Sequence, residues 1–167
     1  MKDLSIILST DDYFSDFIPI VKLAWEKFFP NLNLKIGWVS DEEYIDGNIY
    51  HYKKVENIST ANQAKLMRYY IAMNTDGFSM IEDIDTIPLC SWYINSIIDN
   101  GFDENKLNIE YGDSNHGVYH KNSGLWGKWA ISYTTGTKKV WRKLFGYGEY
   151  FKTFEDMINF YSGFKFL

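Results

Sequence analysis

The stretch over residues 78–89 most constrains what this chain can fold into, because an apolar run there ends in three carboxylates. Glu82, Asp83 and Asp85 follow the run directly, and the chain then turns at Pro88. An unpaired buried charge costs far more free energy than a strand gains, so this strand end is expected at an edge of the core. In extended backbone Asp83 and Asp85 leave on the same face, where two carboxylates repel unless a cation lies between them. Taken alone the pair favours an acidic loop exposed to solvent, and the alternative, a cation site, needs support from the rest of the chain.

The composition is typical of a folded domain and gives little support to nucleic-acid binding. Of the 167 residues, 46% are hydrophobic and 19% are aromatic, which excludes a disordered chain. This length fits one domain with a sizeable core, so residues 1–167 are expected to form a single domain. The formal net charge is −5 and no basic face is evident, whereas nucleic-acid-binding proteins present clustered positive charge.

The single cysteine, Cys90, excludes an internal disulfide and a cysteine-based metal site. No apolar run reaches the roughly 18 residues of a membrane span, and the N-terminus lacks the apolar core of a signal peptide. We therefore expect a soluble, cytoplasmic protein with no membrane span. Only two of the 17 basic residues are arginines, Arg68 and Arg142. A lysine excess is typical of AT-rich coding sequence, so the arginines are the more informative cations.

The first half of the chain alternates in the order expected of an α/β fold with a central, mostly parallel sheet flanked by helices. Residues 4–8 and 34–39 are short apolar runs typical of buried strands, and residues 49–55 indicate a weaker third strand. Between the first two, apolar residues recur at helical spacing over 13–29, until Pro30 ends the helix. The order strand, helix, strand predicts the α/β class.

Polar residues follow each of these strands. Thr10 and Asp11 come after the first strand and Asp41 after the second, while Asp83 and Asp85 follow the apolar run described above. Ligands of open α/β sheets bind outside the carboxyl ends of the strands. Because several polar clusters fall at equivalent ends, we expect them to share one site.

A helix is predicted over residues 60–74, directly before the carboxylate-bearing strand. Thr60 and Gln63 have the spacing of a capping box, with threonine at the cap and glutamine three positions later. Lys65 and Arg68 are three residues apart and lie on one face of the helix. Two cations there would suit a diphosphate, since arginine binds two oxygens at once. The alternative is a solvated cationic face.

The second half of the chain is less clearly patterned. Residues 92–98 fit a helix or a strand equally well, and residues 100–108 look like a loop. A turn is expected at 134–137, where Thr-Thr-Gly-Thr follows an apolar run. Helical spacing predicts further helices over 138–145 and 151–161.

These segments together resemble the GT-A-fold nucleotide-sugar glycosyltransferases. Residues 65–70, Lys-Leu-Met-Arg-Tyr-Tyr, followed by residues 80–89, Met-Ile-Glu-Asp-Ile-Asp-Thr-Ile-Pro-Leu, look like the core of that fold. There, a helix bearing Lys or Arg precedes a strand that ends in an Asp-x-Asp (DXD) motif. The form Asp-Ile-Asp-x-Ile-Pro-Leu is most similar to small glycosyltransferases of large DNA viruses and phages. The resemblance covers residues 4–90; residues 128–133 and 137–145 are also similar to a later segment.

The resemblance implies a single GT-A, Rossmann-like domain that transfers a sugar from a nucleotide diphosphate sugar, a UDP-sugar, to a glycan or glycoprotein acceptor. Mn²⁺ or Mg²⁺ would be held by Asp83 and Asp85, because carboxylates are the hard oxygen ligands these ions prefer. The metal would offset the charge that builds on the leaving diphosphate, with help from Lys65 and Arg68. If the source is viral, the host cytoplasm is the implied compartment.

The remaining roles implied by the resemblance are less closely marked by motifs. Thr10, Asp11 and Asp41 would hold the base and ribose, and Asp83 would also contact the nucleotide sugar. If the reaction inverts, a carboxylate must take the proton of the acceptor hydroxyl. The catalytic candidate is Asp113.

Three alternatives stay open at this point. Glu110 is a second candidate for the base, and His116 or His120 would either complete the metal shell or be ordinary loop histidines. The chain could instead be a catalytically reduced nucleotide-sugar or carbohydrate-binding module of the same fold. A nucleotidyltransferase is disfavoured, because it needs a Gly-rich or basic loop after the first strand and residues 9–12 are acidic.

Overall fold

The strand β1 (Leu4–Asp11) lies inside the central sheet, and all eight of its residues are buried. It pairs in parallel with β2 (Asn33–Val39) on one side and with β4 (Phe78–Ile81) on the other. The edge strand β3 (Ile49–Tyr52) pairs in parallel with β2. The expected parallel core of the sheet is therefore confirmed.

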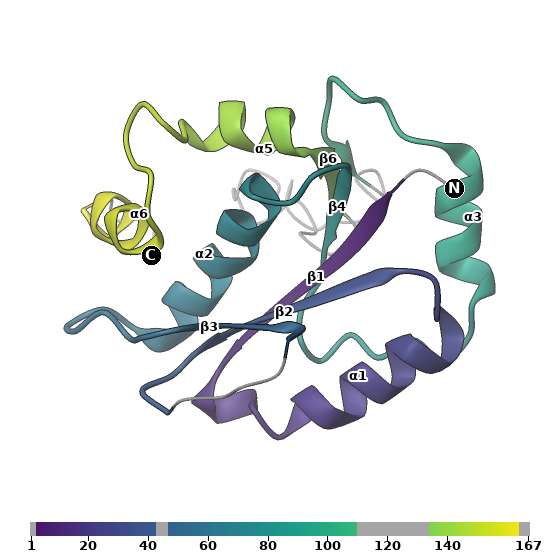
Figure 1. The fold of residues 1–167 in the computed structure, drawn as a ribbon, viewed down its shortest axis with the longest axis horizontal. Helices are drawn as coiled ribbons and strands as arrows, with labels where there is room; N and C mark the ends of the chain where they lie inside the picture. The colour runs from purple at the N-terminus through teal and green to yellow at the C-terminus, as the bar shows by residue number, and fades with distance from the viewer. Residues whose placement is uncertain (1–2, 43–46, 110–133, 164–167) are drawn as a thin grey trace, which may run out of the picture.

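Two antiparallel strands complete the sheet in the computed structural model, which describes residues 3–42, 47–109 and 134–163 (Figure 1). The strand β6 (Thr134–Thr137) pairs antiparallel with β4, and the short β5 (Asn108–Ile109) pairs antiparallel with β6. Within the described residues the strand order is β3-β2-β1-β4-β6-β5. The α/β class with a mostly parallel sheet is confirmed.

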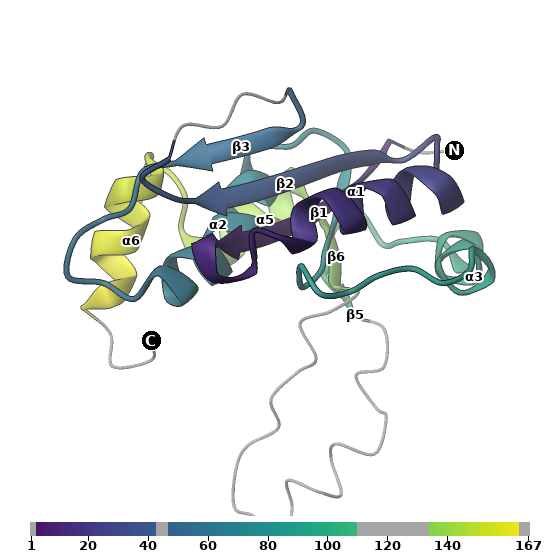
Figure 2. The ribbon, with the colours of Figure 1, turned by 90° about the horizontal axis from the view of Figure 1, so that it is seen from below.

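One face of the sheet is covered by α1 (Phe17–Phe28) and α3 (Trp92–Asn100). These helices share one apolar cluster with the strand residues that point to their side, such as Ile6 and Leu8. Alternate residues of a strand point to opposite faces, so Ile7 belongs to the second cluster. In both views α3 lies at one end of the molecule and α6 at the other (Figure 2).

The opposite face is covered by α2 (Thr60–Met73), α5 (Lys138–Phe145) and α6 (Phe154–Ser162). The helix α2 packs directly on β2 at Gly37, where an added Cβ would lie 2.6 Å from Met67 Sδ. The described helices are all too short or too polar to cross a lipid bilayer.

Arg142 on α5 closes the carboxyl end of α2. Its Nε donates to the carbonyl of Met73 at 2.7 Å, and its Nη2 donates to the side chain of Asn74 at 3.2 Å. The guanidinium also lies 4.4 Å from the ring centroid of Tyr147. Carbonyls at a helix end lack partners within the helix and favour a cation, so this arginine is explained by helix capping.

Three expectations from the sequence are wrong in detail. The first strand does not end at residue 8, because pairing with β2 extends it to Asp11. The turn expected at 134–137 is the strand β6, since Thr-Thr-Gly-Thr has no apolar alternation and is held extended by pairing with β4. The loop expected at 100–108 ends in β5. The ambiguous segment 92–98 is the helix α3.

The helix α2 begins where the sequence predicts, but not through a capping box. The capping position is occupied by Ser59, whose side chain makes no capping hydrogen bond. The hydroxyl of Thr60 instead donates to Asp11 Oδ2 at 2.8 Å, and the buried amide of Gln63 binds the backbone of the preceding loop. Both polar side chains serve contacts across the fold that sequence spacing does not indicate.

Candidate functional site

A cavity of about 280 Å³ opens beside the carboxyl ends of β1 and β4, against one side of α2. This is the sheet edge at which open α/β folds bind ligands. Its walls come from the end of β1, the short 3₁₀ helix η1 (Asp12–Phe14), the first three turns of α2 and the turn after β4. The lining residues are Ser9, Thr10, Asp11, Tyr13, Phe14, Ala61, Ala64, Lys65, Arg68, Asp83, Ile84 and Asp85.

The wall formed by α2 changes character along the helix. Ala61, Ala64, Lys65 and Arg68 line the cavity, and their i, i+3, i+4, i+7 spacing places them on one face. The seven steps from Ala61 to Arg68 span roughly 10 Å at about 1.5 Å per residue. The amino-terminal half of this wall is therefore small and neutral, whereas its far half is cationic.

Arg68 lies at the cationic end and is 3% exposed. Its Nη1 donates to the carbonyl of Glu82 at 3.2 Å and to a carboxylate oxygen of Asp83. The Asp83 side chain is 53% exposed, so the ion pair runs from a buried guanidinium to a carboxylate that faces solvent. Burying a charge is costly unless it is paired, and Asp83 provides that pairing. Lys65, one turn earlier, is exposed.

Asp83 and Asp85 both line the cavity, but not for the reason that alternation along a strand suggests. The strand β4 ends at Ile81, and the amide of Thr86 donates to the carbonyl of Asp83 at 3.0 Å, which closes a turn. The extended backbone assumed for this pair is therefore wrong. Both carboxylates are exposed at the cavity because the turn places them there.

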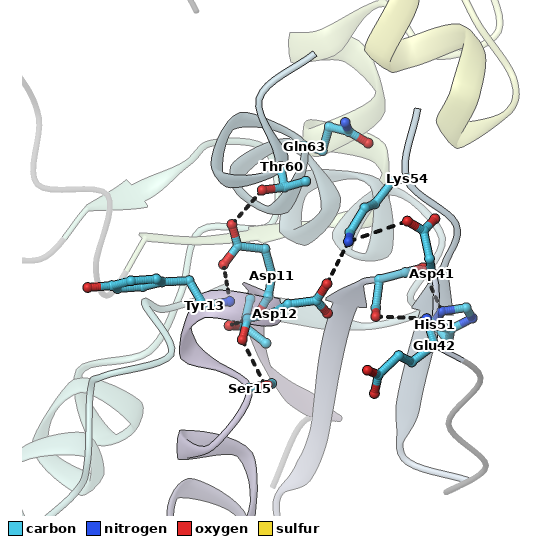
Figure 3. Close-up of polar contacts among 12 residues, drawn as sticks. Asp11, Asp12, Tyr13, Ser15, Asp41, Glu42, His51, Lys54, Thr60 and Gln63 are labelled. Carbon is cyan, nitrogen blue, oxygen red and sulfur yellow. Dashed lines mark hydrogen bonds and ion pairs between the residues drawn. The ribbon is translucent and has the colours of Figure 1, made fainter. Parts of the chain in front are cut away.

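Asp11 connects β1, η1 and α2. Its Oδ1 accepts from the amide of Tyr13 at 3.1 Å, and its Oδ2 accepts from the hydroxyl of Thr60 at 2.8 Å (Figure 3). The neighbouring Thr10 donates its hydroxyl to the Asp11 carbonyl at 2.9 Å. Both side-chain oxygens of Asp11 thus hold the protein together, and only their remaining lone pairs are left for a ligand.

The other predicted site residues lie elsewhere. Asp41 is not part of the cavity lining; its carboxylate lies 3.4 Å from Lys54 Nζ. Asp113 falls outside the described residues, as do Glu110, His116 and His120. Six of the predicted residues do line the cavity: Thr10, Asp11, Lys65, Arg68, Asp83 and Asp85. Their binding roles, and that of Asp41, stay predictions.

Two aromatic residues of the cavity were missed by reasoning from the sequence. Tyr13 is 83% exposed and Phe14 is 42% exposed, and their rings meet edge to face at 4.6 Å. Apolar periodicity assigned Phe14 to the buried face of the helix that follows. Their position directly after a strand end could have indicated a role in the site, because aromatic side chains there lie outside the core.

The carboxylates suit a hard divalent cation only in part. Within the described ranges no group of three or more His, Cys, Asp and Glu side chains could hold a metal ion. Asp83 and Asp85 offer oxygen ligands, and one oxygen of Asp83 is already engaged by Arg68. Mg²⁺ commonly binds through one or two carboxylates together with substrate phosphates and water. The donor set therefore fits a metal that arrives with a phosphate-bearing ligand.

The strand order, with this cavity at the carboxyl ends of β1 and β4, defines a GT-A glycosyltransferase fold. Solved structures of LgtC share it. One, a galactosyltransferase LgtC in complex with donor and acceptor sugar analogues, has a TM-score of 0.54 and 14% identity, covering 93% of this chain and 69% of LgtC. Another, an active-site mutant of LgtC, has a TM-score of 0.52 and 16% identity, covering 83% and 59%.

At this level of identity the likeness establishes the fold, and the chain spans about three fifths of the length of the active-site mutant of LgtC. No family model and no curated protein sequence matches the chain.

Proposed function

We propose that this protein is a glycosyltransferase that takes a sugar from a nucleotide diphosphate sugar, with UDP as the nucleotide, and transfers it to a glycan-type acceptor. The observation that carries the proposal is the polarity of the cavity. Lys65 and Arg68 lie with Asp83 and Asp85 at one end. A diphosphate needs cationic donors and a metal-binding group at the same place.

The opposite end of the cavity suits a nucleoside. Tyr13 and Ala61 both line the cavity, and the Tyr13 amide is joined through Asp11 to Thr60 at the start of α2. An exposed aromatic ring stacks on a nucleobase with a contribution of about 1–3 kcal/mol. In this proposal the base would stack on the Tyr13 ring. Base, ribose and diphosphate would thus follow the α2 wall in order.

The polar residues at the strand ends take the remaining roles in this proposal. Thr10, Asp11 and Asp41 are assigned to the base and ribose. Asp83 and Asp85 would hold Mn²⁺ or Mg²⁺, which when bound supplies a positive charge that offsets the charge on the leaving diphosphate.

Lys65 and Arg68 would bind the diphosphate oxygens of the donor from the α2 side and orient the donor. Asp113 or Glu110 is assigned as the base that takes the acceptor proton. The likeness to viral and phage enzymes rests on the sequence of the Asp-Ile-Asp-x-Ile-Pro-Leu segment.

A thermal-shift screen tests the donor site. UDP and UDP-sugars should raise the melting temperature of the wild-type protein only when Mn²⁺ or Mg²⁺ is present, and Asp83→Ala/Asp85→Ala should abolish that rise. Equal stabilisation of the double variant, or none of the wild type by any nucleotide sugar, would overturn the proposal.

A second candidate is a catalytically reduced binding module, which is favoured by the ion pair of Asp83 with Arg68, because it engages one oxygen of a carboxylate assigned to the metal. Metal-dependent hydrolysis of the UDP-sugar separates the two functions. An enzyme releases UDP slowly in the absence of an acceptor, whereas a module binds the donor and leaves it intact.

A further inference from the structure

An ion-pair bridge lies beside the cavity and joins three segments that are distant in sequence. Nζ of Lys54, just after β3, is 2.6 Å from Asp12 Oδ2 and 3.4 Å from Asp41 Oδ2 (Figure 3). Asp12 begins η1, and Asp41 follows β2. None of the three residues lines the cavity. We refer to these contacts as the Lys54 bridge.

At one end the Lys54 bridge holds η1, a segment that buries little of its own surface. None of the three residues of η1 is buried, although Tyr13 and Phe14 within it form one wall of the cavity. Segments with little buried apolar surface open locally at low free-energy cost. Besides the ring contact of Phe14 with Phe17 on α1, polar ties hold this wall among the described residues, and they include the bond from the Tyr13 amide to Asp11 and the Lys54 bridge.

At its other end the Lys54 bridge is held by the loop after β3, which is bonded to Gln63 of α2. Gln63 of α2 is fully buried, and its Oε1 accepts from the amide of Val55 at 2.9 Å. Its Nε2 donates to the carbonyls of Val55 at 2.8 Å and Ile58 at 2.9 Å. Three bonds thus fix the loop that carries Lys54 to the helix that carries Lys65 and Arg68.

The charges of the bridge are maintained over a wide pH range. Partial burial acts to raise the pKa of the Asp12 carboxyl, but hydrogen bonds from Lys54, Ser40 and Trp38 outweigh it and leave this pKa below its usual value. The hydrogen bond to Asp12 raises the pKa of Lys54. Both groups are therefore ionised near neutral pH.

We propose that Lys54 is a positioning residue that holds the aromatic wall of Tyr13 and Phe14 at a fixed distance from the α2 wall. Lys54 thereby keeps the base end of the cavity open without itself touching the ligand. This inference rests on the proposed function for its consequence, donor affinity, but the positioning of η1 is a property of the protein alone.

The first test measures UDP affinity by calorimetry in saturating Mn²⁺. Lys54→Met keeps the aliphatic stem and removes the charge, and should weaken UDP binding by about three- to fivefold, the range of a partly exposed ion pair. Lys54→Arg should restore the affinity. Asp12→Asn should weaken binding to the same extent, and combining it with Lys54→Met should add nothing further. The matched control is Lys53→Met, at the exposed neighbouring lysine, which should leave affinity unchanged.

The second test follows amide hydrogen exchange in the ligand-free protein. Lys54→Met should speed exchange at the amides of Tyr13 and Ser15, which are bonded within this segment, while amides inside α2 keep their rates. Wild-type exchange and affinity in Lys54→Met would overturn the inference, as would equal losses in Lys53→Met or no rescue by Lys54→Arg. If exchange responds but the wild type binds no UDP, the proposed function fails and the positioning of η1 by Lys54 stands.

Discussion

The guanidinium of Arg68 and the carboxylate of Asp83 form an ion pair that joins a buried cation to an exposed carboxylate, and both residues line the cavity. Arg68 is 3% exposed and its Nη1 also donates to the carbonyl of Glu82, whereas the Asp83 side chain is 53% exposed. The pair fixes Asp83 at the mouth of the cavity. It also means that a metal ion and Arg68 share one carboxylate.

Arg68→Met should weaken UDP binding much more than it lowers stability. The variant removes a charge-assisted donor worth about 1.5–3 kcal/mol, which corresponds to roughly ten- to a hundredfold in affinity, while water can solvate the exposed Asp83. Calorimetric titration with UDP and Mn²⁺ measures the effect. Affinity within twofold of the wild type would contradict a role for Arg68 at the diphosphate.

Arg142→Met should lower stability and leave UDP binding unchanged, in contrast to the same substitution at Arg68. Arg142 lies at the far end of α2, where it bonds the Met73 carbonyl and the Asn74 side chain. Its loss should cost about 1–3 kcal/mol, or roughly 2–12 °C in melting temperature at about 2–4 °C per kcal/mol, with UDP affinity unchanged. Calorimetric melting and titration of the same sample check both parts.

Asp85→Asn should remove the metal-dependent part of ligand binding without changing the stability of the ligand-free protein. Asp85 is exposed, so its charge contributes little to folding, but an amide is a poorer ligand than a carboxylate for a hard cation. The measurement is the UDP-induced melting shift with Mn²⁺ and again after EDTA. Asp99→Asn, at an exposed carboxylate on α3, should retain the full metal-dependent shift.

Gly37→Ala should lower stability because β2 and α2 approach too closely for a side chain. An added Cβ would lie 2.6 Å from both Cγ and Sδ of Met67 and 2.8 Å from Cδ1 of Ile71, and overpacking of this kind costs about 1–3 kcal/mol. Urea unfolding measures the loss. Gly47→Ala is the control, since nothing lies within 4 Å of its added Cβ; equal losses would argue against the packing explanation.

Stability should fall steeply at alkaline pH, in part through Tyr52. Burial, followed by the nearby phenols of Tyr70 and Tyr50, raises the pKa of Tyr52 to about 12, against about 10 in an unfolded chain. The folded state then binds this proton more tightly, so the stabilisation is complete below pH 10 and is lost as pH rises toward 12. Urea unfolding at intervals from pH 8 to 11.5 should show a shallower decline for Tyr52→Phe than for the wild type.

The sequence by itself determined the alternation of strands and helices and the sheet edge at which the polar residues gather. These features depend on local periodicity and on the free-energy cost of burying charge, which act on neighbouring residues in any globular fold. Apolar runs therefore predicted the positions of β1, β2 and β4. Carboxylates just beyond the run before Glu82 likewise indicated a site outside the core.

Tertiary structure decided which polar side chains face the cavity and which are used within the protein. Lys65 and Arg68 lie on the same face of the predicted helix, yet Arg68 is buried and paired with Asp83, whereas Lys65 is exposed. Gln63 anchors a loop instead of capping its own helix, and Asp41 pairs with Lys54 instead of lining the cavity. The strand β6 is held extended by pairing with β4 on one side and β5 on the other. Each outcome depends on a partner outside the residue's own helix or strand, and such a contact leaves no periodic signal in the sequence.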